Sequence, residues 1–93
     1  MMVEYAASAR RDLEGIAAYY RIASGAEVAK LASEHLRHVI DLIAKNPRIG
    51  RVVAGRPQVR AFVVPNYPYK LFYRERDNAT EILRIYHTSR RPF

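Results

Sequence analysis

The sequence predicts an α+β domain in which an α-helical hairpin packs on one face of a small antiparallel sheet. Apolar residues recur at helical spacing between residue 8 and about residue 45. Apolar and polar residues then alternate with the period of a strand between residues 59 and 87, with turn-forming residues between the runs. The length of 93 residues fits a single domain, 1–93, with a modest core.

The first elements are expected to be a short strand at residues 2–5 and then a helix. Ser8 is the predicted N-cap of this helix, with its hydroxyl accepting an amide proton of the first turn. Asp12 lies near the positive end of the helix dipole. The apolar stripe at i, i+3, i+4 and i+7 consists of Leu13, Ile16, Ala17 and Tyr20.

A second helix is predicted to run to about Lys45. Ser24 and Glu27 have the spacing of a capping box, and Pro47 ends the helix because it disfavours helical geometry at the residue before it. The apolar stripe consists of Val28, Leu31, Ala32, His35, Leu36, Val39, Leu42 and Ile43. Two amphipathic helices with a short break indicate a hairpin that lies on a sheet.

Three strands are predicted after a loop at residues 46–57. They span about residues 59–64, 69–74 and 82–87, and their short connections make them antiparallel neighbours. Strand alternation separates two faces. The face predicted to meet the helices carries Val59, Ala61, Val63, Tyr69, Leu71, Tyr73, Leu83, Ile85 and His87.

The net charge of +7 is concentrated in the second half of the chain. Residues 1–46 carry six basic and six acidic side chains, whereas residues 47–93 carry ten basic and three acidic ones. This asymmetry predicts an anionic partner, which would be nucleic acid, a machine that handles nucleic acid, or an acidic protein segment. The alternative is a basic surface that only keeps the chain soluble.

The composition also narrows the class of protein. The absence of cysteine excludes a disulfide framework and a thiolate zinc site. No apolar run approaches the ~20 residues of a membrane span. The N-terminus shows no basic stretch followed by an apolar core, as a signal peptide would. We therefore expect a cytoplasmic protein with no membrane partner and no cofactor.

The order of strand, two helices and three strands resembles the RelE/ParE superfamily of bacterial type II toxins. Residues 47–51 resemble its Pro-x-x-Gly-Arg loop at the exit of the second helix, and residues 60–62 and 69–74 resemble its middle strands. His87 and Arg90 are similar to the His-x-x-Arg that often closes its last strand. The pattern of the first helix is similar at Tyr5, Ala9, Asp12, Leu13, Ile16 and Tyr19.

The resemblance implies one of two activities. RelE-type members cut messenger RNA on the ribosome and place a catalytic arginine just before the middle strand, where this chain has Pro65. Their helix exit is commonly rich in lysine, whereas residues 46–57 carry arginines, and no glutamate stands where a carboxylate base is expected. These departures favour the ParE-like branch. Its members inhibit DNA gyrase by binding, without catalytic residues, and so block replication.

The resemblance further implies a cognate antitoxin, a toxin–antitoxin hetero-oligomer and a role in plasmid stabilisation and growth inhibition. Two alternatives remain open. One is a RelE-like endoribonuclease that acts on ribosome-bound mRNA, with His87, Arg90 and Arg60 as its active groups. The other is an inactive member that only binds its antitoxin.

The candidate target- or antitoxin-binding residues are basic and aromatic. We expect Arg60 to point away from the helices and to form a cationic patch with its neighbours across the strands. The full candidate set is Arg60, Lys70, Arg74, Arg84, Tyr67, Tyr86, Arg90 and Arg91. His87 is interpreted either as a proton shuttle or as a histidine that closes the core edge through a hydrogen bond. His35 and His38 lack a carboxylate at matching spacing, so no metal site is expected.

Overall fold

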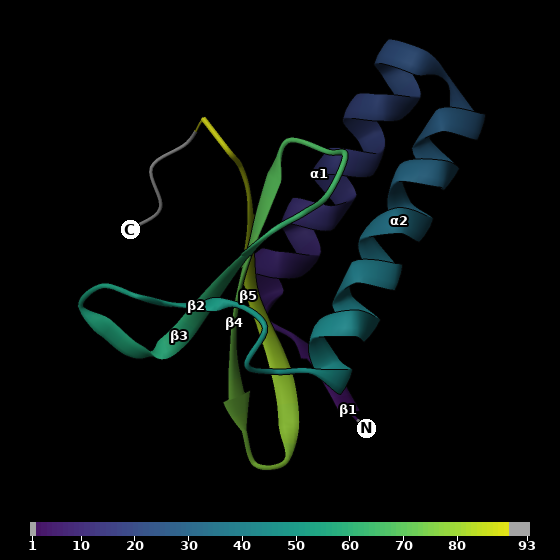
Figure 1. Cartoon of the computed structure of the whole chain (residues 1–93). Helices are drawn as coiled ribbons and strands as arrows, with labels where there is room; N and C mark the ends of the chain where they lie inside the picture. Colours follow the sequence, from purple (N-terminus) through teal and green to yellow (C-terminus); the bar gives the residue numbers. More distant parts are fainter. Residues whose placement is uncertain (1, 90–93) are drawn as a thin grey trace.

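The computed structural model describes residues 2–89 and shows two helices packed on one face of a five-stranded sheet (Figure 1). The predicted α+β class with a helical hairpin is confirmed. In chain order the elements are β1 (Met2–Tyr5), α1 (Ala7–Ser24), α2 (Ala26–Lys45), β2 (Arg51–Val53), β3 (Arg56–Val63), β4 (Tyr69–Arg76) and β5 (Ala79–His87).

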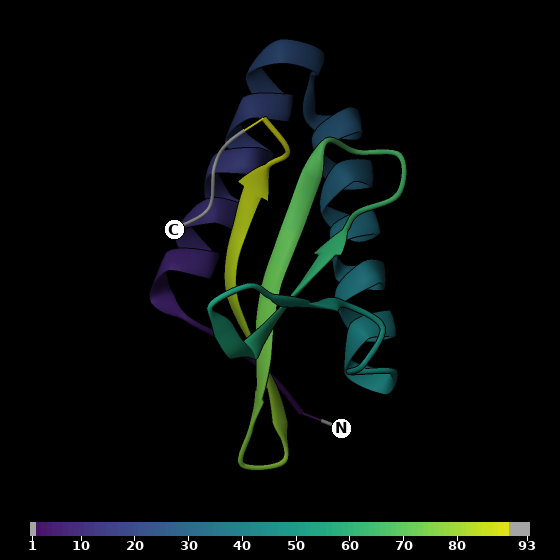
Figure 2. The same cartoon turned by 60° about the vertical axis from the view of Figure 1, so that its left-hand side comes forward.

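The sheet is mixed rather than purely antiparallel. Its strand order is β1-β5-β4-β3-β2, and β1 pairs parallel to β5 whereas the other neighbours are antiparallel. The chain passes from β1 through both helices and three strands before it returns beside β1. In Figure 2 both helices lie behind the sheet, with α1 behind β5. The β2–β3 hairpin crosses in front of the sheet, on the face away from the helices.

The extra strand β2 lies inside the segment predicted as a loop. It has three residues, and Gly55 with φ 78° forms the turn into β3. Because β2 is so short, it carries too few residues to show an alternating pattern. The neighbouring strand β3 also begins earlier than predicted, at Arg56, and β5 begins at Ala79.

The predicted faces of β3 are inverted. Phe62 pairs with Leu71, and directly opposite residues point to the same side, so Phe62 lies on the helix face and packs against the core. Val64 is likewise buried, whereas Val63 is 58% exposed. Arg60 shares the helix face, contrary to the prediction. A stretch with apolar side chains at nearly every position does not show which alternate set is buried.

A bulge also shifts the phase of β5. Phe72 pairs with Arg84 and Tyr73 pairs with Ile82, so Leu83 is the extra residue between them. Ile82 and Ile85 therefore both face the helices and are buried, which corrects the prediction that placed Leu83 in the core and Ile82 outside it.

The helix caps differ from the prediction. Ala6 precedes α1, and Ser8 lies inside the helix, where its hydroxyl donates to the carbonyl of Leu83 at 3.1 Å. Ser24 is the last residue of α1, so it makes no capping box with Glu27. The break between the helices is Gly25 alone, whose φ of 94° suits a residue without a Cβ.

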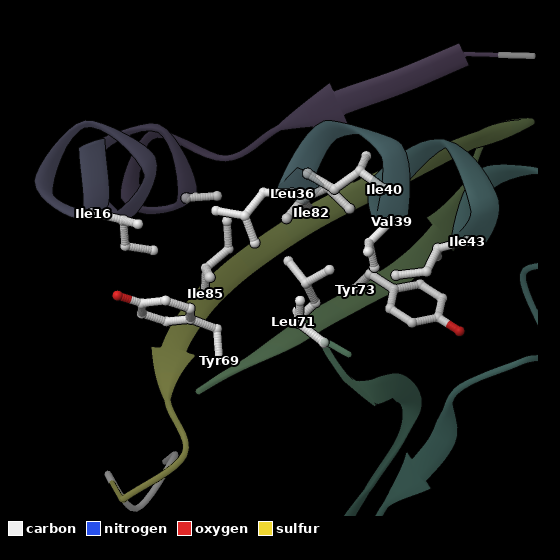
Figure 3. Packing of buried hydrophobic residues seen from close by; sticks show 12 residues of the cluster. Ile16, Leu36, Val39, Ile40, Ile43, Tyr69, Leu71, Tyr73, Ile82 and Ile85 are labelled. Atoms are coloured by element: carbon white, nitrogen blue, oxygen red, sulfur yellow. The ribbon is translucent and has the colours of Figure 1, made fainter. Parts of the chain in front are cut away.

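The core lies between the helices and the strands β4 and β5 (Figure 3). Its members from the sheet include the predicted Tyr69, Leu71 and Tyr73. The stripe of α2 is only partly as predicted, because Val28, Leu31 and Leu42 are exposed. The residues of α2 that are buried are Ala29, Ala32, Leu36, Val39, Ile40, Ile43 and Ala44. Among residues 2–89, no helix has the length and apolar character needed to cross a membrane.

Candidate functional site

Two cations of the predicted patch, Arg84 and Arg74, pair with acids of the same chain. Arg84 donates two hydrogen bonds to Asp12, from Nε at 2.9 Å and from Nη2 at 3.1 Å. This bonding raises the pKa of the Arg84 guanidinium above its ordinary value. Arg74 donates from Nε to Glu81 at 2.7 Å. For Arg84 and Arg74 an acid partner is thus supplied within the domain.

Arg60 does not join the other predicted cations. Its Nη1 donates to the carbonyl oxygen of Gly50 at 2.8 Å, on the side of the sheet that faces the helices. Lys70 instead lies on the opposite face, next to Val63 and Tyr86 in the register of the strands. Arg60, Lys70, Arg74 and Arg84 therefore do not form one continuous surface.

The loop that Arg60 contacts is held by the phenol of Tyr73. The Tyr73 hydroxyl donates to the carbonyl of Pro47 at 2.7 Å and accepts from the amide of Gly50 at 2.9 Å. A Cβ on Gly50 would lie 2.6 Å from the Tyr73 oxygen and 2.8 Å from the carbonyl of Ala61. Gly50 therefore has to be glycine, and the Pro-x-x-Gly stretch serves a structural purpose here.

His87 lies at the end of β5, opposite Tyr69, and is exposed. The backbone amide of Ser89 donates to its Nδ1 at 3.2 Å, and the Ser89 hydroxyl lies 2.8 Å from the same atom. In the neutral ring the proton is therefore assigned to Nε2. The ring also meets Tyr69 edge-on at 5.8 Å. The hydrogen bond of His87 is therefore made to the exposed turn that follows β5, and its ring meets the core at Tyr69.

Of the three groups proposed for a nuclease, the structure describes Arg60 and His87, and these two do not lie together. Tyr73 pairs with Arg60 and Tyr69 pairs with His87, so the two candidates lie four residues apart along β4, or ~13 Å at the rise of a strand. The guanidinium of Arg60 is also engaged with a loop carbonyl. Arg90 and Arg91 lie outside the described residues.

The two tyrosines proposed for partner contact are half-buried. Tyr67 packs at 6.0 Å from Tyr20 and at 4.9 Å from His35, whose Nε2 donates to the carbonyl of Pro65 at 2.7 Å. Tyr86 stacks under the guanidinium of Arg84, 4.3 Å from its ring centroid. Each ring thus contributes to the packing of the domain itself.

A hollow of about 570 Å³ opens between α1 and the ends of β4 and β5. Its lining combines rings, aliphatic side chains and charged groups, among them Arg11, Gly15, Tyr19, Tyr69, Ile85 and His87. Sequence reasoning predicted no role for Arg11, Gly15 or Tyr19 in a site. The available signal was a glycine within a predicted helix, which lowers helix stability unless something compensates.

The part of the chain that the structure describes contains no candidate metal site. Over residues 2–89, no three His, Cys, Asp or Glu side chains are grouped so that they would hold a metal ion.

The described residues thus form a basic α+β domain with hollows at its surface. The family model described as "ParE toxin of type II toxin-antitoxin system, parDE" matches residues 3–92. The chain therefore belongs to the ParE toxin family of type II toxin–antitoxin systems.

A solved structure agrees with this assignment. The chain is similar to a protein of the structure titled "Chromosomal ParDE TA system from P. aeruginosa", with a TM-score of 0.82 and 25% sequence identity. The match covers 94% of this chain and 95% of the other. A comparison with curated protein sequences finds no significant match.

Proposed function

We propose that this ParE-family chain inhibits DNA gyrase by binding to it, and that a cognate antitoxin encoded beside it neutralises it. The observation that carries the proposal is the separation of the candidate nuclease groups in a ParE-family fold. Arg60 is bonded to the carbonyl of Gly50, and His87 lies ~13 Å away along the sheet. General acid–base catalysis needs such groups within hydrogen-bonding reach of one substrate.

The surface supports action by binding. Val52 is 51% exposed and Val63 is 58% exposed on the two strands farthest from β1. Arg51 is exposed and pairs with Ala61, so it brings positive charge to the face of the sheet that carries Val63, whereas Val52 pairs with Arg60 on the other face. Interfaces commonly combine an apolar centre with arginine, and positive charge accelerates encounter with an acidic partner or a DNA-bound enzyme.

The test is a supercoiling assay with purified gyrase, relaxed plasmid and the purified chain. Inhibition of supercoiling, with cleaved DNA trapped by gyrase, is the expected result. Addition of the protein encoded by the neighbouring gene should restore supercoiling. Full activity of gyrase at a molar excess of the chain would contradict the proposal.

A parallel assay in a translating extract separates the alternatives. Cleavage of ribosome-bound mRNA by the chain, with gyrase unaffected, would support the endoribonuclease and return His87 to a catalytic role. If gyrase stays active, ribosome-bound mRNA stays intact and expression without the neighbouring gene is harmless, the chain is an inactive member that binds only its antitoxin.

A further inference from the structure

One edge of the sheet carries positive charge without acidic side chains. Residues 46–64, which form the loop after α2 and the strands β2 and β3, contain four arginines and no aspartate or glutamate. Arg60 donates to a backbone carbonyl, which leaves its charge uncompensated. Lys70 lies on the next strand, β4, and neither Lys70 nor Arg51 makes an ion pair within residues 2–89. We call residues 46–64 together with Lys70 the basic edge.

Arg51 and Lys70 lie on the face of the sheet away from the helices. Arg51 pairs with Ala61 and Lys70 pairs with Val63, and directly opposite residues point to the same side. Phe62, between Ala61 and Val63 on β3, packs on the core, so its two neighbours point away from the helices. In Figure 2 the β2–β3 hairpin lies in front of this face. The two cations therefore belong to the open face of the sheet.

The acidic side chains of this face lie toward its opposite edge. Glu4 on β1 pairs in register with Glu81 on β5. Glu81 Oε1 lies 2.7 Å from Nε of Arg74 and 3.7 Å from Nη1 of Arg76. The face is thus polarised, with positive charge over β2, β3 and the start of β4 and with Glu4 at the other side. A polyanion would be attracted to the basic edge and repelled from β1.

The cations are spread along the basic edge rather than gathered around a hollow. Arg51 and Lys70 are separated by two strand spacings and by two residues along the strand, or ~12 Å between their backbones. Neither lines the hollow beside α1, the one beside the α2–β2 loop or the one between β1 and the helices. A small ligand is usually held in a concave site by converging groups. Cations spaced along a face suit a linear polyanion such as duplex DNA, which carries one negative charge per ~1.7 Å of its axis.

The aromatic rings on the same face are engaged within the domain. Phe72 is 1% exposed and meets Tyr86 edge-on at 5.7 Å. The guanidinium of Arg84 lies over the Tyr86 ring at 4.3 Å and is itself bonded to Asp12. Binding of single-stranded nucleic acid relies on bases that stack on such rings as well as on cations. Contacts with phosphates alone, which a duplex presents along both strands, therefore fit this face better.

We propose that the basic edge binds the phosphate backbone of double-stranded DNA through Arg51 and Lys70, without reading its sequence. In the inhibition proposed above, this DNA is the segment that gyrase holds. That second statement rests on the proposed function, whereas DNA binding by the chain alone does not. Two phosphate contacts give a modest affinity. On gyrase, however, the DNA is present at a roughly millimolar effective concentration, so even a modest contact contributes to inhibition.

The test titrates a labelled DNA duplex with the purified chain and follows fluorescence anisotropy. Raising NaCl from about 50 mM to about 200 mM should weaken binding about 10-fold, because two phosphate contacts give a slope of about −2 in log K against log salt. A second duplex of the same length and different sequence should bind equally well. Arg51→Ala combined with Lys70→Ala should weaken binding at least ~10-fold and remove most of the salt slope.

The matched control is Arg21→Ala combined with Lys30→Ala. It removes the same two charges from exposed positions of the helical hairpin, away from the basic edge, and should leave the affinity within ~2-fold of wild type. Each single substitution, Arg51→Ala or Lys70→Ala, should remove about half of the slope. These single variants keep the test decisive if the double variant does not fold.

Three results would overturn the DNA site. The first is no binding of the duplex by wild type, or equal binding by the two double variants. The second is tighter binding of single-stranded DNA or RNA than of the duplex, which would assign the face to that partner. The third is a variant at Arg51 and Lys70 that binds the duplex as wild type does but binds the neighbouring gene's product more weakly, which would assign the face to the antitoxin.

The supercoiling assay separates this proposal from the proposed function. The double variant at Arg51 and Lys70 should require about 10-fold more protein than wild type for the same inhibition. If wild type and this variant inhibit gyrase equally, the contact with DNA on gyrase is wrong and inhibition by binding stands. If the chain binds the duplex but leaves gyrase active, the proposed function is wrong and the DNA site stands.

Discussion

A single phenol fixes the backbone between α2 and β2. The Tyr73 hydroxyl joins the carbonyl of Pro47 to the amide of Gly50, and Gly50 in turn accepts from Arg60. The hydroxyl acts at once as donor and acceptor, so loss of this one atom leaves two backbone groups without a partner. The residue that holds the loop comes from β4, so Pro47 and Gly50 are tied to the sheet.

Tyr73→Phe should lower the free energy of unfolding by about 1–3 kcal/mol, because buried polar groups that lose a partner keep their desolvation penalty. The midpoint of urea unfolding measures this change. Tyr19→Phe removes a hydroxyl from an exposed ring and serves as the control, with an expected change near zero. Equal midpoints for the two variants would show that the phenol does not hold the loop.

The same residue predicts a loss of stability in alkali. Burial raises the pKa of Tyr73 above its ordinary value of 10.0, so the folded state keeps the proton that the unfolded state releases. This stabilisation is fully present below pH ~10 and is lost as pH rises through the folded-state pKa. Unfolding free energies measured from pH 8 upward should fall above pH ~10, and less steeply in Tyr73→Phe. Tyr5 and Tyr69, whose pKa values are also raised, should retain part of the decline.

At the scale of the elements, α1 completes the edge of β5 beyond the point where β1 ends. The amide of Ala6 donates to the carbonyl of Ile82 at 3.0 Å, and the Ser8 hydroxyl donates to that of Leu83. Asp12 accepts from the amide of Ile85 at 2.8 Å. The backbone of Ala6, just before α1, and the side chains of α1 thus supply partners that protect this edge from pairing with another chain. This explains why a serine and an aspartate lie inside α1 rather than at its cap.

Asp12→Ala should destabilise the fold by about 1–3 kcal/mol, because the amide of Ile85 and the half-buried Arg84 both lose their acceptor. Asp12→Asn keeps an acceptor for the amide but removes the charge opposite Arg84, so an intermediate loss is expected. Thermal unfolding ranks the three proteins. Glu14→Ala, an exposed position on the same helix, is the control. An alanine variant as stable as this control would contradict the role given to Asp12.

The sequence predicts the helices and long strands better than it predicts which of their side chains contact one another. Both helices and the three long strands follow from periodicity, which each has enough residues to display. The bulge at Leu83 cannot be predicted from periodicity, because one extra residue changes which side chains are buried without changing the composition of the strand. The site shows the same limit. The basic residues are evident in the sequence, but Arg84 and Asp12 are 72 positions apart, so only the fold reveals their pairing.

At the scale of the whole molecule, the net charge is +7. Ion pairs within the chain, such as Arg74 with Glu81 and Arg84 with Asp12, neutralise charge locally but leave this net charge unchanged. Such a field accelerates encounter with an acidic partner over distances comparable to the Debye length. Association of an acidic antitoxin with this positive field should be the step most sensitive to ionic strength. Its dissociation depends more on the apolar contacts of the interface.

Raising NaCl from about 0.1 M to about 1 M, which shortens the Debye length from ~10 Å to ~3 Å, should therefore slow association of the neighbouring gene's product by roughly 10-fold or more. The dissociation rate should change far less, because apolar contacts are not screened by salt. Stopped-flow association and dissociation measured separately give the two rates. Arg48→Ala combined with Arg51→Ala, which removes two exposed cations away from the hollow, should slow association at low salt only. A salt effect confined to dissociation would mean that charge acts within the bound complex, and the account of long-range attraction would be wrong.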